Sequence, residues 1–163
     1  MKKLFLTAAV LFTFGFANAQ EGGFKTGLHL GLPIGDIQDA YSFAGGVDLA
    51  YTWKVADKIV VGATTGYTYY SGKSVSGFTI TAAGLIPIAA TAQYSINDNF
   101  FVGADLGFAL LSSTSGGGSS NGVYYQPKFG YQTEKIELYA GYKAAAITGG
   151  SFSTIGIGFN YKY

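Results

Sequence analysis

The sequence contains no cysteine and only one histidine, and its ten basic residues are all lysines. Without cysteine, no disulfide can hold the fold together and no lipid can be attached through an N-terminal thiol. Arginine supplies the bidentate contacts that proteins make with phosphates and bases, so its absence argues against binding to nucleic acid. The fold must therefore be stable without disulfides, and nucleic acid is not expected as a partner.

Long apolar runs are also absent after the first nineteen residues, so no helical membrane span is expected there. The apolar run at residues 4–16 is too short for such a span, because a bilayer requires roughly 20 residues. It follows Lys2 and Lys3 and precedes Ala17-Asn18-Ala19, which is the order of a secretory signal peptide. We predict a cleaved signal peptide at residues 1–19 and a single domain at residues 20–163.

Glycine and aromatic residues are abundant, with 25 Gly, 13 Tyr and 13 Phe, and this mixture favours strands and turns. Apolar side chains alternate with small or polar ones along most of the domain, which is the pattern of strands with two unlike faces. The alternation predicts eight strands, at residues 24–32, 43–54, 59–69, 80–94, 102–110, 123–131, 136–145 and 155–163.

The connections between these strands alternate in length. Those after the second, fourth and sixth strands are tight, and the others are mostly longer, as in outer-membrane barrels with short periplasmic turns and longer external loops. An eight-stranded barrel has an interior just wide enough for its own side chains, so the bulky apolar face is expected to face lipid. In lipid the sheet must close on itself. We therefore predict an all-β, eight-stranded antiparallel up-and-down transmembrane β-barrel.

Three segments, at residues 86–94, 100–110 and 159–163, resemble the small outer-membrane β-barrel family that includes outer-membrane protein X and the transmembrane domain of outer-membrane protein A. The resemblance implies a location in the outer membrane, contact with its lipid, and a monomeric state. It also implies periplasmic chaperones and the barrel-assembly machinery as partners during biogenesis. The implied assembly signal is the alternating C-terminal series Ile155, Ile157, Phe159, Tyr161 and Tyr163.

Charged residues fall on the small face of several strands, which is the predicted interior. Counting back from the predicted connections places three polar pairs across neighbouring strands: His29 with Asp48, Asp105 with Lys128, and Glu137 with Lys162. No partner is predicted for Lys25, Lys54 or Lys143. Buried charge is tolerated chiefly when it is paired, so we interpret the three pairs as structural groups that plug the lumen.

Little in the sequence supports a catalytic or a metal-dependent function. His29 could act as a catalytic base or a pH sensor, but a structural pair with Asp48 is the favoured interpretation. Lipid A acyltransferases and deacylases use this scaffold, yet the serines here lie almost wholly in the outer loops, away from His29. Asp36 and Asp39 share the first outer loop but are too few to form a calcium site. No catalytic residue, cofactor or metal site is predicted.

The sequence therefore predicts a non-catalytic integral outer-membrane protein whose barrel anchors four extracellular loops for surface interaction. The alternative is a small porin-like channel for solutes, which would require an open lumen. A soluble lipocalin-like binding protein is a third possibility, and it would be soluble without detergent.

Overall fold

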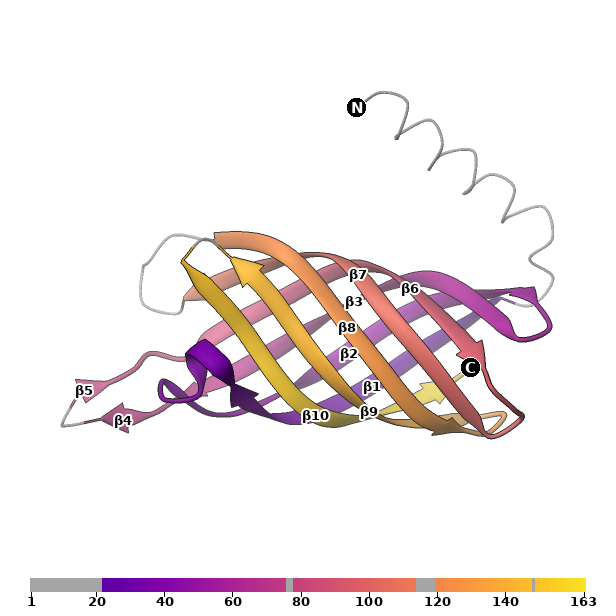
Figure 1. Cartoon of the computed structure of the whole chain (residues 1–163), viewed down its shortest axis with the longest axis horizontal. Coiled ribbons are helices and arrows are strands. Elements are labelled where there is room, and N and C mark those ends of the chain that lie inside the picture. Colours follow the sequence, from indigo (N-terminus) through magenta and orange to yellow (C-terminus); the bar gives the residue numbers. More distant parts are fainter. Residues whose placement is uncertain (1–21, 76–77, 114–119, 148) are drawn as a thin grey trace, which may run out of the picture.

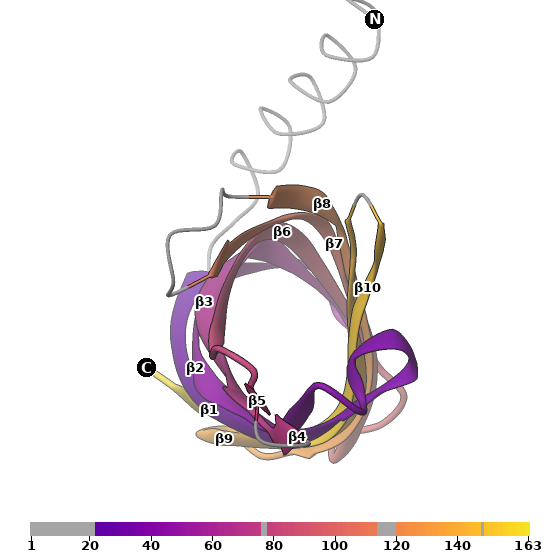
Figure 2. The ribbon, with the colours of Figure 1, turned by 90° about the vertical axis from the view of Figure 1, so that its left-hand side faces the viewer.

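The computed structural model describes residues 22–75, 78–113, 120–147 and 149–163, so the predicted signal peptide lies outside the described residues. Antiparallel pairing runs around a closed barrel, in which β10 returns to pair with β1 (Figures 1 and 2). Its eight strands are β1 (Gly22–Ile34), β2 (Tyr41–Ala56), β3 (Ile59–Gly72), β6 (Ala83–Ser95), β7 (Phe100–Ser113), β8 (Ser120–Gln132), β9 (Ile136–Ile147) and β10 (Gly150–Lys162). The predicted fold class is confirmed.

The two ends of the barrel differ, and we call them the turn end and the loop end. The turn end holds the tight connections after β2, β6 and β8 and the C-terminus, on the right of Figure 1. In the turn after β6, Asn97 Oδ1 accepts hydrogen bonds from the backbone N–H groups of Asn99 (2.9 Å) and Phe100 (2.8 Å). At the loop end, β9 and β10 are joined through Gly149, whose φ of +93° favours glycine.

The loop end contains more regular structure than the sequence predicts. A short 3-10 helix, η1 (Gly35–Ile37), follows β1, and the chain between β3 and β6 forms β4 (Ser74–Val75) and β5 (Phe78–Thr79). This small hairpin continues the β3–β6 hairpin beyond the rim, and β6 accordingly begins at Ala83 rather than at residue 80 (Figure 1). The predicted loop at residues 71–77 is therefore partly strand.

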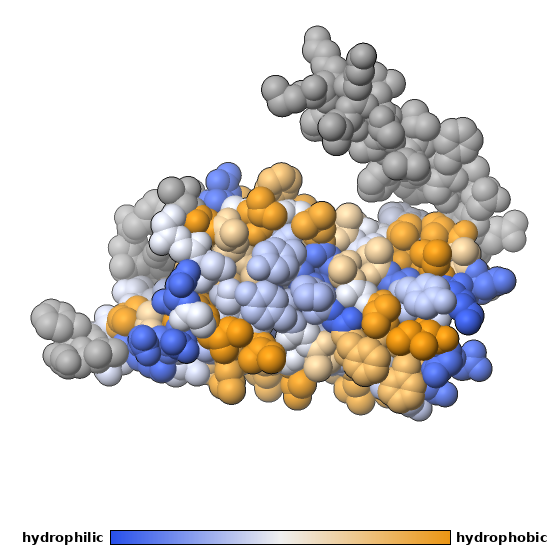
Figure 3. Space-filling model, in the orientation of Figure 1, coloured by the Kyte–Doolittle hydropathy of each residue, from blue (hydrophilic) through white to orange (hydrophobic). Residues whose placement is uncertain are grey.

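The outer wall of the barrel is strongly apolar. Leu28, Leu30 and Leu32 on β1 are each more than 60% exposed, and large apolar side chains are exposed on every barrel strand. In Figure 3, hydrophobic side chains cover much of the wall, a weakly hydrophilic patch lies at its centre, and strongly hydrophilic side chains gather mainly toward the two ends. Such an apolar belt is unfavourable in water and matches a lipid-facing surface.

No helix in the described part of the chain is long and apolar enough to cross a membrane.

The barrel interior has an apolar core near the loop end. Ile37 of η1 packs there with Tyr70, Leu85, Leu111 and Phe152, which come from four different strands. The rings of Tyr70 and Phe152 meet edge-on with centroids 5.3 Å apart. This group, which we call the apolar plug, closes the loop end of the lumen above the polar interior.

Candidate functional site

The middle of the lumen holds a buried polar group around the single histidine. His29 Nδ1 lies 2.7 Å from Asp48 Oδ2, and His29 Nε2 lies 3.0 Å from Thr68 Oγ1. The Lys143 ammonium lies 3.2 Å from His29 Nε2 and 3.8 Å from Asp48 Oδ1. An ammonium can only donate, so Nε2 accepts and the proton on Nδ1 points to Asp48. We call these four residues, from β1, β2, β3 and β9, the His29 cluster.

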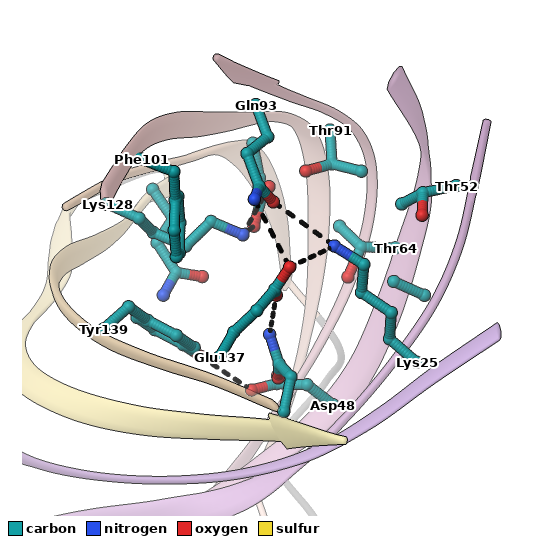
Figure 4. A pocket seen from close by; sticks show the side chains of 14 residues that line it. Lys25, Asp48, Thr52, Thr64, Thr91, Gln93, Phe101, Lys128, Glu137 and Tyr139 are labelled. Carbon is teal, nitrogen blue, oxygen red and sulfur yellow. Dashed lines mark hydrogen bonds and ion pairs between the residues drawn. The ribbon is translucent and has the colours of Figure 1, made fainter. Parts of the chain in front are cut away.

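A second pair lies nearer the turn end. Lys128 Nζ donates to Asp105 Oδ2 at 2.9 Å, and the Asp105 side chain is almost completely buried. The Lys128 ammonium also lies 5.5 Å from the centroid of the Tyr139 ring. The hydroxyl of Tyr139 donates to Asp48 Oδ2 at 3.1 Å, which connects this pair to the His29 cluster (Figure 4).

The third predicted pair forms with a different lysine. Glu137 accepts a hydrogen bond from Lys25 Nζ at 2.6 Å, and both side chains are buried. Asn160 Nδ2 donates to Glu137 Oε2 at 3.0 Å, and Gln93 Nε2 donates to Oε1 at 3.3 Å. Figure 4 shows Lys25, Gln93 and Glu137 converging from different sides of the barrel. The predicted partner, Lys162, forms no ion pair within 4 Å among the described residues.

The difference between the predicted and the observed partner of Glu137 arises from strand register. Glu137 lies opposite Asn160, two positions from Lys162, and Asp48 likewise lies opposite Gly27 rather than His29. Hairpin register depends on turn geometry, which the sequence alternation does not specify. A shift of two residues keeps every side chain on its face, so diagonal contacts still join His29 to Asp48. For Glu137, the lysine that reaches it comes from β1 instead.

Two lysines without a predicted partner are thus members of the network. Lys25 binds Glu137, and Lys143 contacts both His29 and Asp48. In the described lumen, three lysines (Lys25, Lys128 and Lys143) face three carboxylates (Asp48, Asp105 and Glu137), of which Lys128 and Asp48 are half-buried and the others buried. Each lysine lies within 4 Å of a carboxylate, so the interior charges balance.

The His29 cluster has the order of groups found at nucleophilic active sites, with a hydroxyl, an imidazole and a carboxylate in sequence. Its surroundings do not suit catalysis. Thr68 is 1% exposed, and the adjoining cavity has a volume of about 20 Å³, room for roughly one water. Binding pockets for small molecules usually measure about 300 Å³ or more. The Lys143 ammonium also lies 3.3 Å from Thr68 Oγ1.

The charged layer nearer the turn end is also well filled, and a larger cavity of about 290 Å³ lies below it at the turn-end mouth. A second cavity, between the Asp105–Lys128 pair and Glu137, has a volume of about 30 Å³. Gln93 Nε2 also donates to Gln132 Oε1 at 2.8 Å, so the layer around Glu137 extends across the turn end of the lumen. Within the described residues, no three His, Cys, Asp or Glu side chains are grouped so that they could hold a metal ion.

The residues of the predicted assembly signal lie along β10, except Tyr163, which directly follows it. Ile155, Ile157, Phe159 and Tyr163 are exposed on the outer wall, and Tyr161 is half-buried. Their alternation thus forms part of the apolar belt.

Comparison with known proteins identifies the fold. No protein-family model and no curated protein sequence matches the chain. The crystal structure of Ail, the attachment invasion locus protein of Yersinia pestis, matches with a TM-score of 0.60 at 16% identity, covering 87% of this chain and 97% of that one. The N-terminal β-barrel domain of Pseudomonas aeruginosa OprF matches with a TM-score of 0.58 at 13% identity, covering 88% and 100%.

A third similar structure is neisserial surface protein A, with a TM-score of 0.53 at 18% identity, covering 87% of this chain and 97% of that one. At these identities the likeness concerns the fold alone. The chain has the fold of the small eight-stranded outer-membrane β-barrels.

Proposed function

We propose that this protein is a non-catalytic integral outer-membrane protein, whose barrel is a closed anchor that presents its loop end for surface interaction. The observation that supports the proposal most directly is the filled lumen. A solute passing through would have to displace both the apolar plug and the charged layers beneath it. The cavities inside those layers measure only about 20 and 30 Å³.

We further propose how the protein is exported and inserted. Residues 1–19 are removed as a signal peptide, residues 20–163 form the barrel, and the C-terminal series ending at Tyr163 is read by the barrel-assembly machinery. The loop end then faces outward and the turn end faces the periplasm. Support for this orientation comes from the longer connections at the loop end. Outer-membrane lipid surrounds the apolar belt, and the protein is a monomer.

The rim at the loop end is fixed by polar contacts between connections. Asp36 Oδ2 accepts a hydrogen bond from the Ser151 N–H at 3.0 Å, which joins the first loop to the β9–β10 turn. Lys73 Nζ donates to the Gln38 carbonyl at 2.7 Å, which joins the hairpin of β4 and β5 to the same loop. Within the described residues, these contacts join three of the loop-end connections to one another.

The chemistry of that rim favours uncharged partners. The connections at residues 35–41, 71–82, 112–122 and 147–151 contain only three charged residues, namely Asp36, Asp39 and Lys73. Ail has been crystallised with the heparin analogue sucrose octasulfate. With one lysine against two aspartates, the present chain offers little attraction to such a polyanion. Hydroxyl and amide groups dominate its rim.

A porin-like channel is the alternative, and conductance decides between the two. The refolded mature protein is placed in a planar bilayer, with folding checked by the gel shift between unboiled and boiled samples. A conducting porin in the same bilayer serves as the positive control. We expect the folded barrel to be silent. Steady single-channel steps would overturn the closed-anchor proposal and favour the channel.

A further inference from the structure

The wall of the barrel is interrupted between β8 and β9. Strand pairing stops after Tyr125 and Ala144 and resumes at Lys128 and Gly141, with the same register on both sides. Pro127 lies inside the gap. Its ring removes the backbone N–H that would bond to the opposite strand. Because β7 and β8 remain paired through Pro127, the missing donor points toward β9.

A second interruption lies between β3 and β6. Pairing stops after Thr65 and Ile88 and resumes at Thr68 and Leu85, again with unchanged register. Pro87 lies in this gap, and its pairing with β7 is intact. Both gaps therefore have the same origin, which is a proline whose missing N–H faces the neighbouring strand.

In each gap the carbonyl opposite the proline, that of Gly66 or Tyr142, loses its strand donor, and the gaps differ in the side chains that bridge the two strands. At the β3–β6 gap, the Thr65 hydroxyl donates to the Pro87 carbonyl at 2.8 Å. At the β8–β9 gap, the residue in the corresponding position is Gly141, which has no side chain. Tyr142, opposite Pro127, directs its hydroxyl away, to Ser153 Oγ at 3.0 Å. Among the described residues, no side chain donates to the Pro127 carbonyl.

The position of the β8–β9 gap makes this difference important. Pro127 and Tyr142 lie on the lipid-facing side of the wall, where lipid offers no donor to replace the one that the Tyr142 carbonyl has lost. Behind them, Gln126 and Lys143 are buried in the lumen and line the 20 Å³ cavity beside the His29 cluster. The gap thus separates lipid from a buried ammonium group by a wall that has lost part of its strand pairing.

We infer that the β8–β9 seam at Pro127 and Tyr142 is a built-in lateral opening point of the barrel. Local separation of the two strands at this seam joins the lipid side to the interior around Lys143. The hydroxyl of Thr65 keeps the matching seam between β3 and β6 closed.

Amide hydrogen exchange, measured by NMR on the protein in lipid nanodiscs, tests this inference. A net difference of one hydrogen bond corresponds to roughly a tenfold change in an opening equilibrium. Only the amides of Tyr142 and Gly66 face the two gaps, because successive N–H groups of a strand point to opposite sides. We expect the Tyr142 amide to exchange at least about tenfold faster than the Gly66 amide. Pro127→Ala restores the missing donor and is expected to slow exchange at Tyr142 by about the same factor.

Thr65→Val is the matched variant, because it removes only the bridging hydroxyl. It is expected to raise exchange at Gly66 toward the rate at Tyr142 and to leave the β8–β9 seam unchanged. Equal protection of the two seams in the unaltered protein would overturn the inference. So would a folded Pro127→Ala variant with unchanged exchange. If that variant does not fold, the comparison of the two seams and the Thr65→Val variant provide the test. Unchanged exchange at the β3–β6 seam in Thr65→Val counts against the inference.

Discussion

Removing the Glu137 carboxylate tests how far paired charges hold the lumen together. In Glu137→Ala, the Lys25 ammonium loses its 2.6 Å partner while its side chain remains largely buried. Breaking a buried ion pair from one side typically costs about 3–5 kcal/mol, because the remaining charge is left without a partner. Lys25 also donates to Gln93 Oε1 at 3.2 Å and borders the cavity of about 290 Å³ at the turn end, where water can enter. We therefore expect a loss near the low end, about 3 kcal/mol.

The assay is urea unfolding of the refolded protein in lipid vesicles, followed by the fluorescence of Trp53, the only tryptophan. Glu134→Ala is the matched control, because this exposed glutamate lies in the turn only three residues away. Its unfolding free energy should change by no more than about 0.5 kcal/mol.

A double variant, Lys25→Met with Glu137→Leu, separates an orphaned charge from lost packing. Replacing both members of a buried pair by apolar residues is often close to neutral. We expect it to be more stable than Glu137→Ala by about 2 kcal/mol or more. The reasoning fails if Glu137→Ala costs no more than the Glu134 control. It also fails if the double variant is less stable than Glu137→Ala, since the orphaned charge of Lys25 would then not be the source of the loss.

Three further predictions address the plug, a turn and the processing site. Tyr70→Ala removes a fully buried ring from the apolar plug and should lower the unfolding free energy by about 3–5 kcal/mol; a loss below 1 kcal/mol in the same urea assay would contradict tight packing there. Gly149→Val forces a β-branched residue to a φ of +93° and should cost about 1–3 kcal/mol, whereas Gly103→Ala, inside a strand, should have a smaller effect. Intact-mass analysis of the protein purified from outer membranes should give a chain that begins at Gln20, and an uncleaved chain would refute the signal-peptide prediction.

The alternation of side chains was enough to predict which residues face lipid and which face the lumen. Leu28 and His29 illustrate this, because the period of two assigns them to opposite faces whatever the exact register. The partner of Glu137 could not be predicted in the same way. It depends on a two-residue choice of register set by turn geometry, and on a contact from Lys25 that reaches around the closed barrel.

The apolar plug was missed for a related reason. Tyr69 and Tyr70 are identical neighbours, so composition cannot indicate which one enters the lumen, and only the continued phase of β3 places Tyr70 inside. Phe152 precedes the strand predicted at residues 155–163, whereas in the structure β10 already begins at Gly150. The small-face pattern holds over the middle of the strands and breaks at the loop end, where large rings such as those of Tyr70 and Phe152 are buried in the interior.

The uneven distribution of charge between the two ends bears on how the barrel enters its membrane. In the proposed orientation, the loop-end connections must be carried through the hydrocarbon during insertion, whereas the turn end stays on the side of entry. Moving one charged side chain to the centre of a bilayer costs about 2.5–3.5 kcal/mol on insertion scales. The travelling connections contain three charged residues, while the shorter turns at residues 55–58, 95–99 and 133–135 contain five. The loop-end connections must cross the bilayer, and their lower charge gives them the lower energetic barrier to crossing. The charged turns favour remaining at the periplasmic face.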